Sequence, residues 1–214
     1  MRDLDLNLLE NELKKRWEIP YAWGRKQNDL WDSHSQFIYK VETWEELLQK
    51  IDEVAHQKEL DGFQFRNYAC NRWYNFKSAM AVEKIFCDQV GVKASLSRTN
   101  RLIDFNLRGV DFDHKTSVFP QNFPGGLDDA RRNLPALVEW LYKNQSTQQR
   151  QHFGNRLFLV VFDHKGEHWK LKAELSFLKN IITSYVQTFN SANLVKLHLL
   201  TGNTTYSDII WAVK

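Results

Sequence analysis

The sequence predicts an α/β protein with a mixed central sheet flanked by helices, and three segments carry this prediction. Residues 72–90 have the apolar spacing of an amphipathic helix, and residues 101–116 alternate like a β-hairpin around Arg108-Gly109. Residues 157–162 form a continuous apolar run, which is typical of a central strand covered on both faces. With 214 residues, the chain can bury a sizeable core as one large domain or as one domain with an appendage.

The composition is that of a compact globular protein. Hydrophobic residues make up 43% of the chain, which includes eight Trp. No apolar run approaches the length of a membrane span, and we do not expect the N-terminal residues to act as a signal peptide. The two cysteines, Cys70 and Cys87, provide no disulfide framework, so we expect reduced thiols in a cytoplasmic protein without a membrane segment.

Residues 1–60 are predicted to be a mostly helical extension packed on a core formed by residues 61–214. A capping box at residues 43–46 opens a helix that continues to about His56. Residues 36–41 have the composition of a short strand. A first helix is marked by apolar residues at helical spacing: Leu6, Leu9, Leu13 and Trp17.

Beyond the hairpin, residues 118–126 are rich in turn formers and are expected to border a cleft. A helix with Pro135 in its first turn follows, and its buried stripe comprises Leu134, Leu137, Val138 and Leu141. Another helix is predicted over residues 173–189, with closing strands at residues 194–200 and 206–213. His164 and His168 surround the predicted tip of a hairpin, and turn formation explains them better than zinc binding.

The hairpin at residues 101–116 brings acidic side chains together. Its loop pairs Leu107 with Val110, and therefore Asp104 with Asp113, with Cβ atoms about 5 Å apart. Like charges at that separation destabilise a sheet, and a divalent cation between the two carboxylates would compensate. Lys115 is predicted to lie on the same face, one period beyond Asp113. The alternative interpretation is the solvated outer face of an ordinary hairpin.

Glu83 falls near the middle of the apolar arc predicted for the helix at residues 72–90. The arc consists of Trp73, Phe76, Met80, Phe86, Cys87 and Val90, and the polar side carries Lys77, Lys84 and Asp88. A buried carboxylate needs a partner or a metal ion. We therefore expect Glu83 either to support a metal site or to form a salt bridge with Arg98 or Arg101.

The chain has an acid, Asp104, on one predicted strand and the sequence acid-x-lysine, Asp113 to Lys115, on the next. This arrangement resembles that of the PD-(D/E)XK nuclease superfamily, which has the restriction-endonuclease-like fold. The order helix, hairpin, helix and buried strand agrees over about residues 70–165. The resemblance implies Mg²⁺, or Mn²⁺ in its place, bound by Asp104, Asp113 and the main-chain carbonyl of His114, with Glu83 contributing. Lys115 would be the catalytic lysine. The chain departs from the family pattern at Ile103, which replaces a proline, and in the tight spacing of the two acids.

The resemblance implies hydrolysis of phosphodiester bonds, most directly by an endonuclease of restriction or repair type. It implies double-stranded DNA as the substrate. Many relatives are homodimers, so the resemblance also makes a homodimer one expected arrangement. The alternatives are a non-catalytic nucleic-acid-binding or interaction module with the same fold, and an RNA-processing enzyme. The net charge of +3 is a weak argument for nucleic acid. Arginines that could contact phosphate, or equally form structural ion pairs, are Arg66, Arg72, Arg98, Arg101, Arg108, Arg131 and Arg132.

Overall fold

The computed structural model describes residues 4–23, 25, 27, 30–95, 103–144, 154–198 and 204–214. The chain forms two compact units, one comprising Met1–Ala81 with Ala173–Ser176 and the other Val82–Lys172 with Phe177–Lys214. The boundary between them falls inside one long helix, whereas the sequence prediction placed a boundary near residue 60. Every strand in the described ranges belongs to the second unit, which also holds the predicted site residues.

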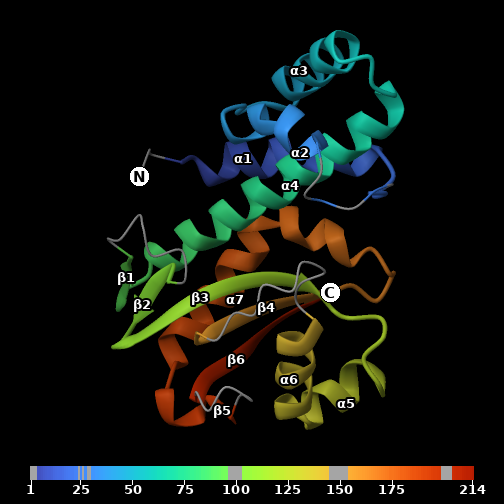
Figure 1. Cartoon of the computed structure of the whole chain (residues 1–214). Coiled ribbons are helices and arrows are strands. Elements are labelled where there is room, and N and C mark those ends of the chain that lie inside the picture. The colour runs from blue at the N-terminus through green and yellow to red at the C-terminus, as the bar shows by residue number, and fades with distance from the viewer. Residues whose placement is uncertain are drawn as a thin grey trace. The chain divides into compact units, whose positions relative to one another are not determined.

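The second unit is built on a six-stranded mixed sheet with the order β1-β2-β3-β4-β6-β5, which confirms the predicted α/β class (Figure 1). Strands β1 to β3 form an antiparallel meander, β3, β4 and β6 run parallel, and β5 pairs antiparallel with β6. The strands are β1 (Val92–Ala94), β2 (Phe105–Leu107), β3 (Val110–Val118), β4 (Arg156–Phe162), β5 (Val195–His198) and β6 (Thr204–Val213).

The β2–β3 hairpin has the predicted register, because Leu107 pairs with Val110 and Phe105 with Phe112. Arg108 and Gly109 both have positive φ, 46° and 94°, as a two-residue hairpin turn with the correct twist requires. The alternation predicted for the hairpin gives it an apolar face, on which Phe105, Leu107 and Phe112 are fully buried and Ile103 and Val110 half-buried. This rigid hairpin fixes the position of β3 relative to the residues before β2.

Helices cover both faces of the sheet, and alternation along β4 shows which side chains meet them. Phe158 and Val160 face α5 (Gly126–Arg132) and α6 (Leu134–Asn144), where they join one hydrophobic core. The opposite face meets the end of α4 (Gly62–Cys87) and the segment after α7 (Leu175–Thr188). The aromatic contacts there are Phe86 on Phe105 and Phe189 on Phe112.

The first unit is helical, as predicted, and consists of α1 (Leu6–Lys14), η1 (Lys15–Glu18), α2 (Leu30–His34), η2 (Gln36–Tyr39), α3 (Trp44–Gln57) and the first part of α4. Thr43 caps α3 by accepting a hydrogen bond from the Glu46 N–H at 3.3 Å, so this predicted helix start is confirmed. The strand predicted over residues 36–41 is wrong. Ile38 and Val41 are buried three residues apart, which suits the 3₁₀ turn found there rather than a strand.

Helix α4 differs from its predicted form at both ends and in its faces. It begins at Gly62, and Val90 lies beyond its end with 94% of its surface exposed, so Val90 is not part of an apolar arc. Lys77, which was assigned to the polar side, is buried. No helix in the described part of the chain is both long enough and apolar enough to cross a membrane.

The hairpin predicted around residues 164–168 is also wrong. Asp163 and Gly166 close a turn through a 2.9 Å backbone hydrogen bond, and the chain then enters η3 (His168–Ala173) instead of a returning strand. His168 Nδ1 accepts a hydrogen bond from the Asp163 N–H at 2.8 Å, and this bond stabilises the turn. The side chain of His168 therefore has a structural partner.

Candidate active site around strand β3

Strand β3 is an interior strand, and this decides how exposed its polar side chains are. Its partner β4 runs parallel, with Asp113 opposite Arg156, His114 opposite Leu157 and Lys115 opposite Phe158. The Asp113 side chain is only 15% exposed as a result. The hairpin face that carries Asp113 is therefore not a freely solvated outer face at that position.

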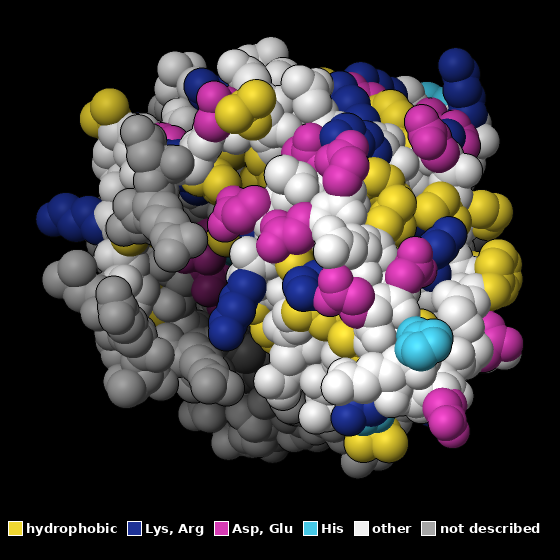
Figure 2. Space-filling view, turned by 90° about the horizontal axis from the view of Figure 1, so that it is seen from above, with side chains coloured by type: hydrophobic (Ala, Val, Ile, Leu, Met, Phe, Trp, Pro, Cys, Tyr) yellow, Lys and Arg dark blue, Asp and Glu magenta, His cyan; other side chains and the backbone are white. Residues whose placement is uncertain are grey.

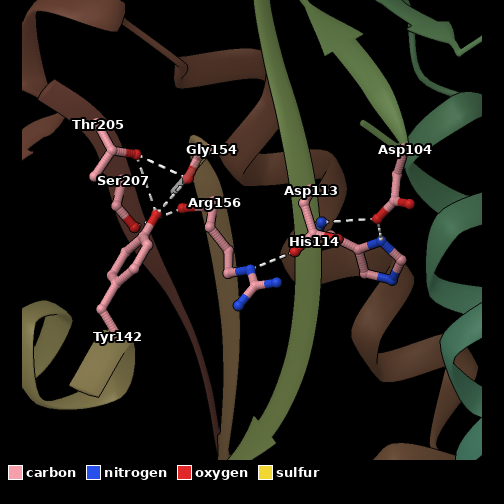
Figure 3. Close-up of polar contacts among 8 residues, drawn as sticks. All are labelled: Asp104, Asp113, His114, Tyr142, Gly154, Arg156, Thr205 and Ser207. Atoms are coloured by element: carbon pink, nitrogen blue, oxygen red, sulfur yellow. Dashed lines mark hydrogen bonds and ion pairs between the residues drawn. The ribbon is translucent and has the colours of Figure 1, made fainter. Parts of the chain in front are cut away.

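Asp113 and Lys115 lie on the face of the sheet that carries Arg156. The Asp113 carboxylate accepts a charge-assisted hydrogen bond from Arg156 Nε (Figure 3). The side chain of Arg156 is 10% exposed. Burial lowers the pKa of Lys115, the positive charge of Arg156 lowers it further, and Asp113 opposes the shift. The sheet thus places a carboxylate, an arginine and a lysine together.

Asp104 lies just before β2, and its carboxylate is turned toward His114. Its Oδ2 accepts hydrogen bonds from the His114 backbone N–H at 2.8 Å and from the imidazole Nδ1 at 2.7 Å (Figure 3). Burial alone would raise the pKa of Asp104, but the hydrogen bonds and charge of His114, together with the charge of Arg156, lower it. This carboxylate is stabilised in its charged form.

The prediction that the carboxylates of Asp104 and Asp113 face each other is therefore wrong for the side chains. Strand β2 begins at Phe105, and the Asp104 N–H donates to the Phe112 carbonyl at 2.9 Å rather than to Asp113. The Asp104 carboxylate turns to the backbone N–H of His114 at the open edge of β3. Asp113 instead points to the sheet face, toward Arg156. The two carboxylates therefore accept hydrogen bonds from different basic partners, His114 and Arg156.

His114 contributes more than the main-chain carbonyl expected from the sequence. Its imidazole is 6% exposed and lies 6.1 Å from the rings of both Phe105 and Phe86. Within the described residues, its Nε2 is buried without a hydrogen-bond partner. Because the N–H and C=O of one strand residue point to the same edge, its carbonyl is directed toward the edge where Asp104 lies.

Glu83, on α4, belongs to the same neighbourhood as Asp104 and His114. Burial raises the pKa of Glu83, the negative charge of Asp104 raises it further, and His114 opposes the shift. None of the described residues forms a hydrogen bond or ion pair with its carboxylate. The proposed salt-bridge partners, Arg98 and Arg101, lie outside the described residues.

The structure thus brings all the predicted site residues to the first half of β3, but in two groups. Glu83, Asp104 and the His114 imidazole form one group, and Asp113, Lys115 and Arg156 form the other on the opposite face. The groups adjoin, because the charge of Arg156 contributes to the lowered pKa of Asp104.

Sequence reasoning did not identify Arg156. It immediately precedes the apolar run 157–162, and the parallel pairing of β3 with β4 puts it opposite Asp113. Polar contacts hold this start of β4 in place (Figure 3). Ser207 Oγ donates to the Arg156 carbonyl, while Tyr142 Oη and Thr205 Oγ1 donate to the Gly154 carbonyl at 2.9 and 2.8 Å.

The donor chemistry of these residues fits a hard divalent cation. Carboxylate and carbonyl oxygens are the ligands that Mg²⁺ prefers, and it commonly uses one or two carboxylates with water and phosphate. Within the described parts of the chain, no three His, Cys, Asp or Glu side chains are grouped as a metal site. A cation bound by Asp104 and Asp113 would replace the basic partners that these acids now have.

The predicted phosphate-contacting arginines have structural partners wherever they are described. Arg66 pairs with Asp52, Arg72 with Asp32 and Arg132 with Asp129; Arg108 donates to the Phe189 carbonyl, and Arg131 lies over the Trp211 ring. Basic and acidic side chains are intermixed on the face seen in Figure 2. The structural reading of these arginines is supported for each one described.

Comparison of the chain with protein-family models, curated proteins and solved structures gave no match.

Proposed function

We propose that this chain is a metal-dependent nuclease that hydrolyses phosphodiester bonds, with Mg²⁺ as the cofactor and double-stranded DNA as the substrate. The observation that carries the proposal is the order of elements around β3. Helix α4 with Glu83 is followed by the β1–β3 meander with Asp104 and Asp113, then by α5, α6 and the parallel strand β4. This order and these positions agree with the restriction-endonuclease-like fold that the sequence resembles.

The residues of the chain have distinct roles in this proposal. Asp104, Asp113 and the His114 carbonyl would hold the cation, with Glu83 supporting the Asp104 side. When bound, the cation would stabilise negative charge developing at phosphorus. Lys115 would orient the attacking water and stabilise charge in the transition state from its buried position beside Asp113. The His114 imidazole is a positioning group, because it holds the Asp104 carboxylate through Nδ1.

A second candidate function is favoured by the same contacts. Asp104 is compensated by His114 and Asp113 by Arg156, so both acids are stable in this arrangement without a metal ion. That is the state expected of a module that keeps the fold and binds nucleic acid or another protein without catalysis. The two functions differ in whether a divalent cation binds and whether Lys115 matters.

One experiment separates the two functions. Supercoiled plasmid, linear duplex, single-stranded DNA and structured RNA are each incubated with the protein in Mg²⁺, Mn²⁺ or EDTA. We expect cleavage of the duplex substrates in Mg²⁺ or Mn²⁺ but not in EDTA, and none by Lys115→Met, which retains the proposed metal ligands. Undiminished cleavage by Lys115→Met would refute its catalytic role. Binding without cleavage by the wild type would support the non-catalytic module.

A further inference from the structure

The contact between Arg156 and Asp113 carries an inference that rests on the proposed nuclease function. We propose that Arg156 is an exchangeable partner of Asp113. In the metal-free protein it neutralises the Asp113 carboxylate, and when a divalent cation takes that carboxylate, Arg156 binds a phosphate group of the nucleic acid.

The geometry of the contact leaves most of the guanidinium group unused. An arginine in a structural pair with a carboxylate commonly donates two parallel hydrogen bonds from its planar fork. Arg156 donates only from Nε, the single contact drawn from its guanidinium group in Figure 3. Within the described residues, its terminal nitrogens have no partner, yet they are not among the buried unpartnered atoms. They are therefore not fully enclosed, although Arg156 as a whole is only 8% exposed, and they can accept a new ligand.

The backbone of Arg156 is fixed by its two neighbouring strands, whereas its guanidinium group makes a single hydrogen bond with the described residues. Arg156 pairs with Asp113 on one side and Ser207 on the other, and Ser207 Oγ donates to its carbonyl. The guanidinium carbon lies 6.0 Å from the centre of the Phe158 ring. Loss of the Nε bond would let the guanidinium turn without a change in the sheet.

Charge gives the reason for exchange. A largely buried carboxylate needs a positive partner, and Arg156 and a divalent cation compete for the same oxygen atoms of Asp113. If the cation wins, Arg156 and Lys115 remain beside it with excess positive charge. A phosphate group supplies the missing negative charge and accepts two hydrogen bonds from one arginine. This chemistry selects a phosphodiester as the new partner of Arg156.

The first test measures metal binding without nucleic acid, by titrating Mn²⁺ and following its electron paramagnetic resonance signal. Arg156→Gln removes the competitor of the cation, so we expect it to bind Mn²⁺ about tenfold more tightly than wild type. Arg156→Lys keeps a positive charge and should remain close to wild type. The matched control is Arg132→Gln, which removes an arginine from an exposed ion pair of the same unit. Equal or weaker Mn²⁺ binding by Arg156→Gln would overturn the exchange.

The second test measures duplex binding in a Lys115→Met background, which the proposed function expects not to cleave. In Mn²⁺, Arg156→Gln and Arg156→Lys should each weaken duplex binding about tenfold, because neither offers the planar fork to phosphate. In EDTA the effect of Arg156→Lys should be small, since Asp113 then holds this residue. An equal loss in both solutions, or no loss in Mn²⁺, would overturn the proposal.

The two proposals fail in different ways. If the wild type binds no Mn²⁺ and cleaves nothing, the proposed nuclease function fails, and the exchange fails with it. If the wild type binds Mn²⁺ and cleaves but the Arg156 variants match it in both measurements, only the exchange fails. Should Arg156→Gln not fold, Arg156→Lys still tests the phosphate contact.

Discussion

Replacement of Asp104 by asparagine tests the contact between this carboxylate and His114. The wild-type carboxylate accepts two hydrogen bonds, at 2.8 Å from the backbone N–H and at 2.7 Å from Nδ1. Hydrogen bonds to a charged group contribute about 1.5–3 kcal/mol each and neutral ones about 0.5–1.5 kcal/mol. Asparagine offers only a neutral oxygen for the same donors. We expect Asp104→Asn to lose about 1–3 kcal/mol of unfolding free energy in EDTA at neutral pH.

The pH dependence of this loss follows from the lowered pKa of Asp104 in the folded protein. An acid with a lowered folded pKa contributes stability above its unfolded pKa, and the contribution is lost as the pH falls through the folded pKa. The difference in stability between wild type and Asp104→Asn should therefore be full at neutral pH and should shrink in acid. Urea unfolding over a range of pH values, followed by circular dichroism, measures it.

Divalent cations extend the same experiment. A ligand at 100 times its dissociation constant stabilises a protein by about 2.7 kcal/mol. Wild type should gain stability of this order in saturating Mg²⁺ or Mn²⁺, and Asp104→Asn should gain little. Asp111→Asn is the matched control, because this exposed acid of the same hairpin contacts Asn106 and is not one of the proposed metal ligands. It should show a normal metal response.

Two results would refute this reasoning. If Asp104→Asn is as stable as wild type in EDTA, or more stable, then the bonds to His114 do not stabilise the protein. Repulsion between two facing carboxylates would instead give that outcome. If both proteins respond equally to the metal, Asp104 is not one of its ligands.

Two further predictions concern acids whose pKa is raised. Burial raises the pKa of Glu83, so its charged form destabilises the fold above the pKa of the unfolded state. Glu83→Gln should therefore be as stable as wild type in EDTA, or about 1 kcal/mol more stable. The same variant should need more Mg²⁺ for cleavage. A loss of stability with unchanged metal dependence would indicate a structural ion pair instead. Burial likewise raises the pKa of Asp208, which accepts a 2.9 Å hydrogen bond from Tyr185 Oη. Tyr185→Phe should cost about 1–3 kcal/mol in urea unfolding at neutral pH, and a cost near zero would show that water replaces the hydroxyl.

Local patterns in the sequence predicted the hairpin and the start of α3. The register of β2 and β3 follows from the alternation of side chains and the two turn residues, and Thr43 caps α3 through contacts only three residues apart. The strand at residues 36–41 failed, because a short apolar segment has no periodicity strong enough to separate a strand from a 3₁₀ turn.

The sequence predicted which residues lie near one another in the candidate site, but it did not predict which of them contact each other. Alternation assigned Asp113 and Lys115 to one face and His114 to the other, as observed. It could not show that the Asp104 carboxylate turns to His114, because side-chain orientation at a strand end is set by tertiary packing. Nor could it identify Arg156 as a partner, because the pairing of β3 with β4 joins residues far apart in the chain.

The different sequence separations of the site contacts have a consequence for folding. The bond between Asp104 and the His114 N–H closes a separation of 10 residues, whereas the contact between Asp113 and Arg156 spans 43 residues. Short loops close with less entropy loss, and parallel pairing is slow because its strands are distant in the chain. We expect the hairpin with Asp104 and His114 to form before β4 docks, so Asp113 passes through an intermediate stage without Arg156. Higher φ-values in β4 than in the hairpin would reverse this order. Any divalent cation present during that stage would meet Asp113 before its arginine does.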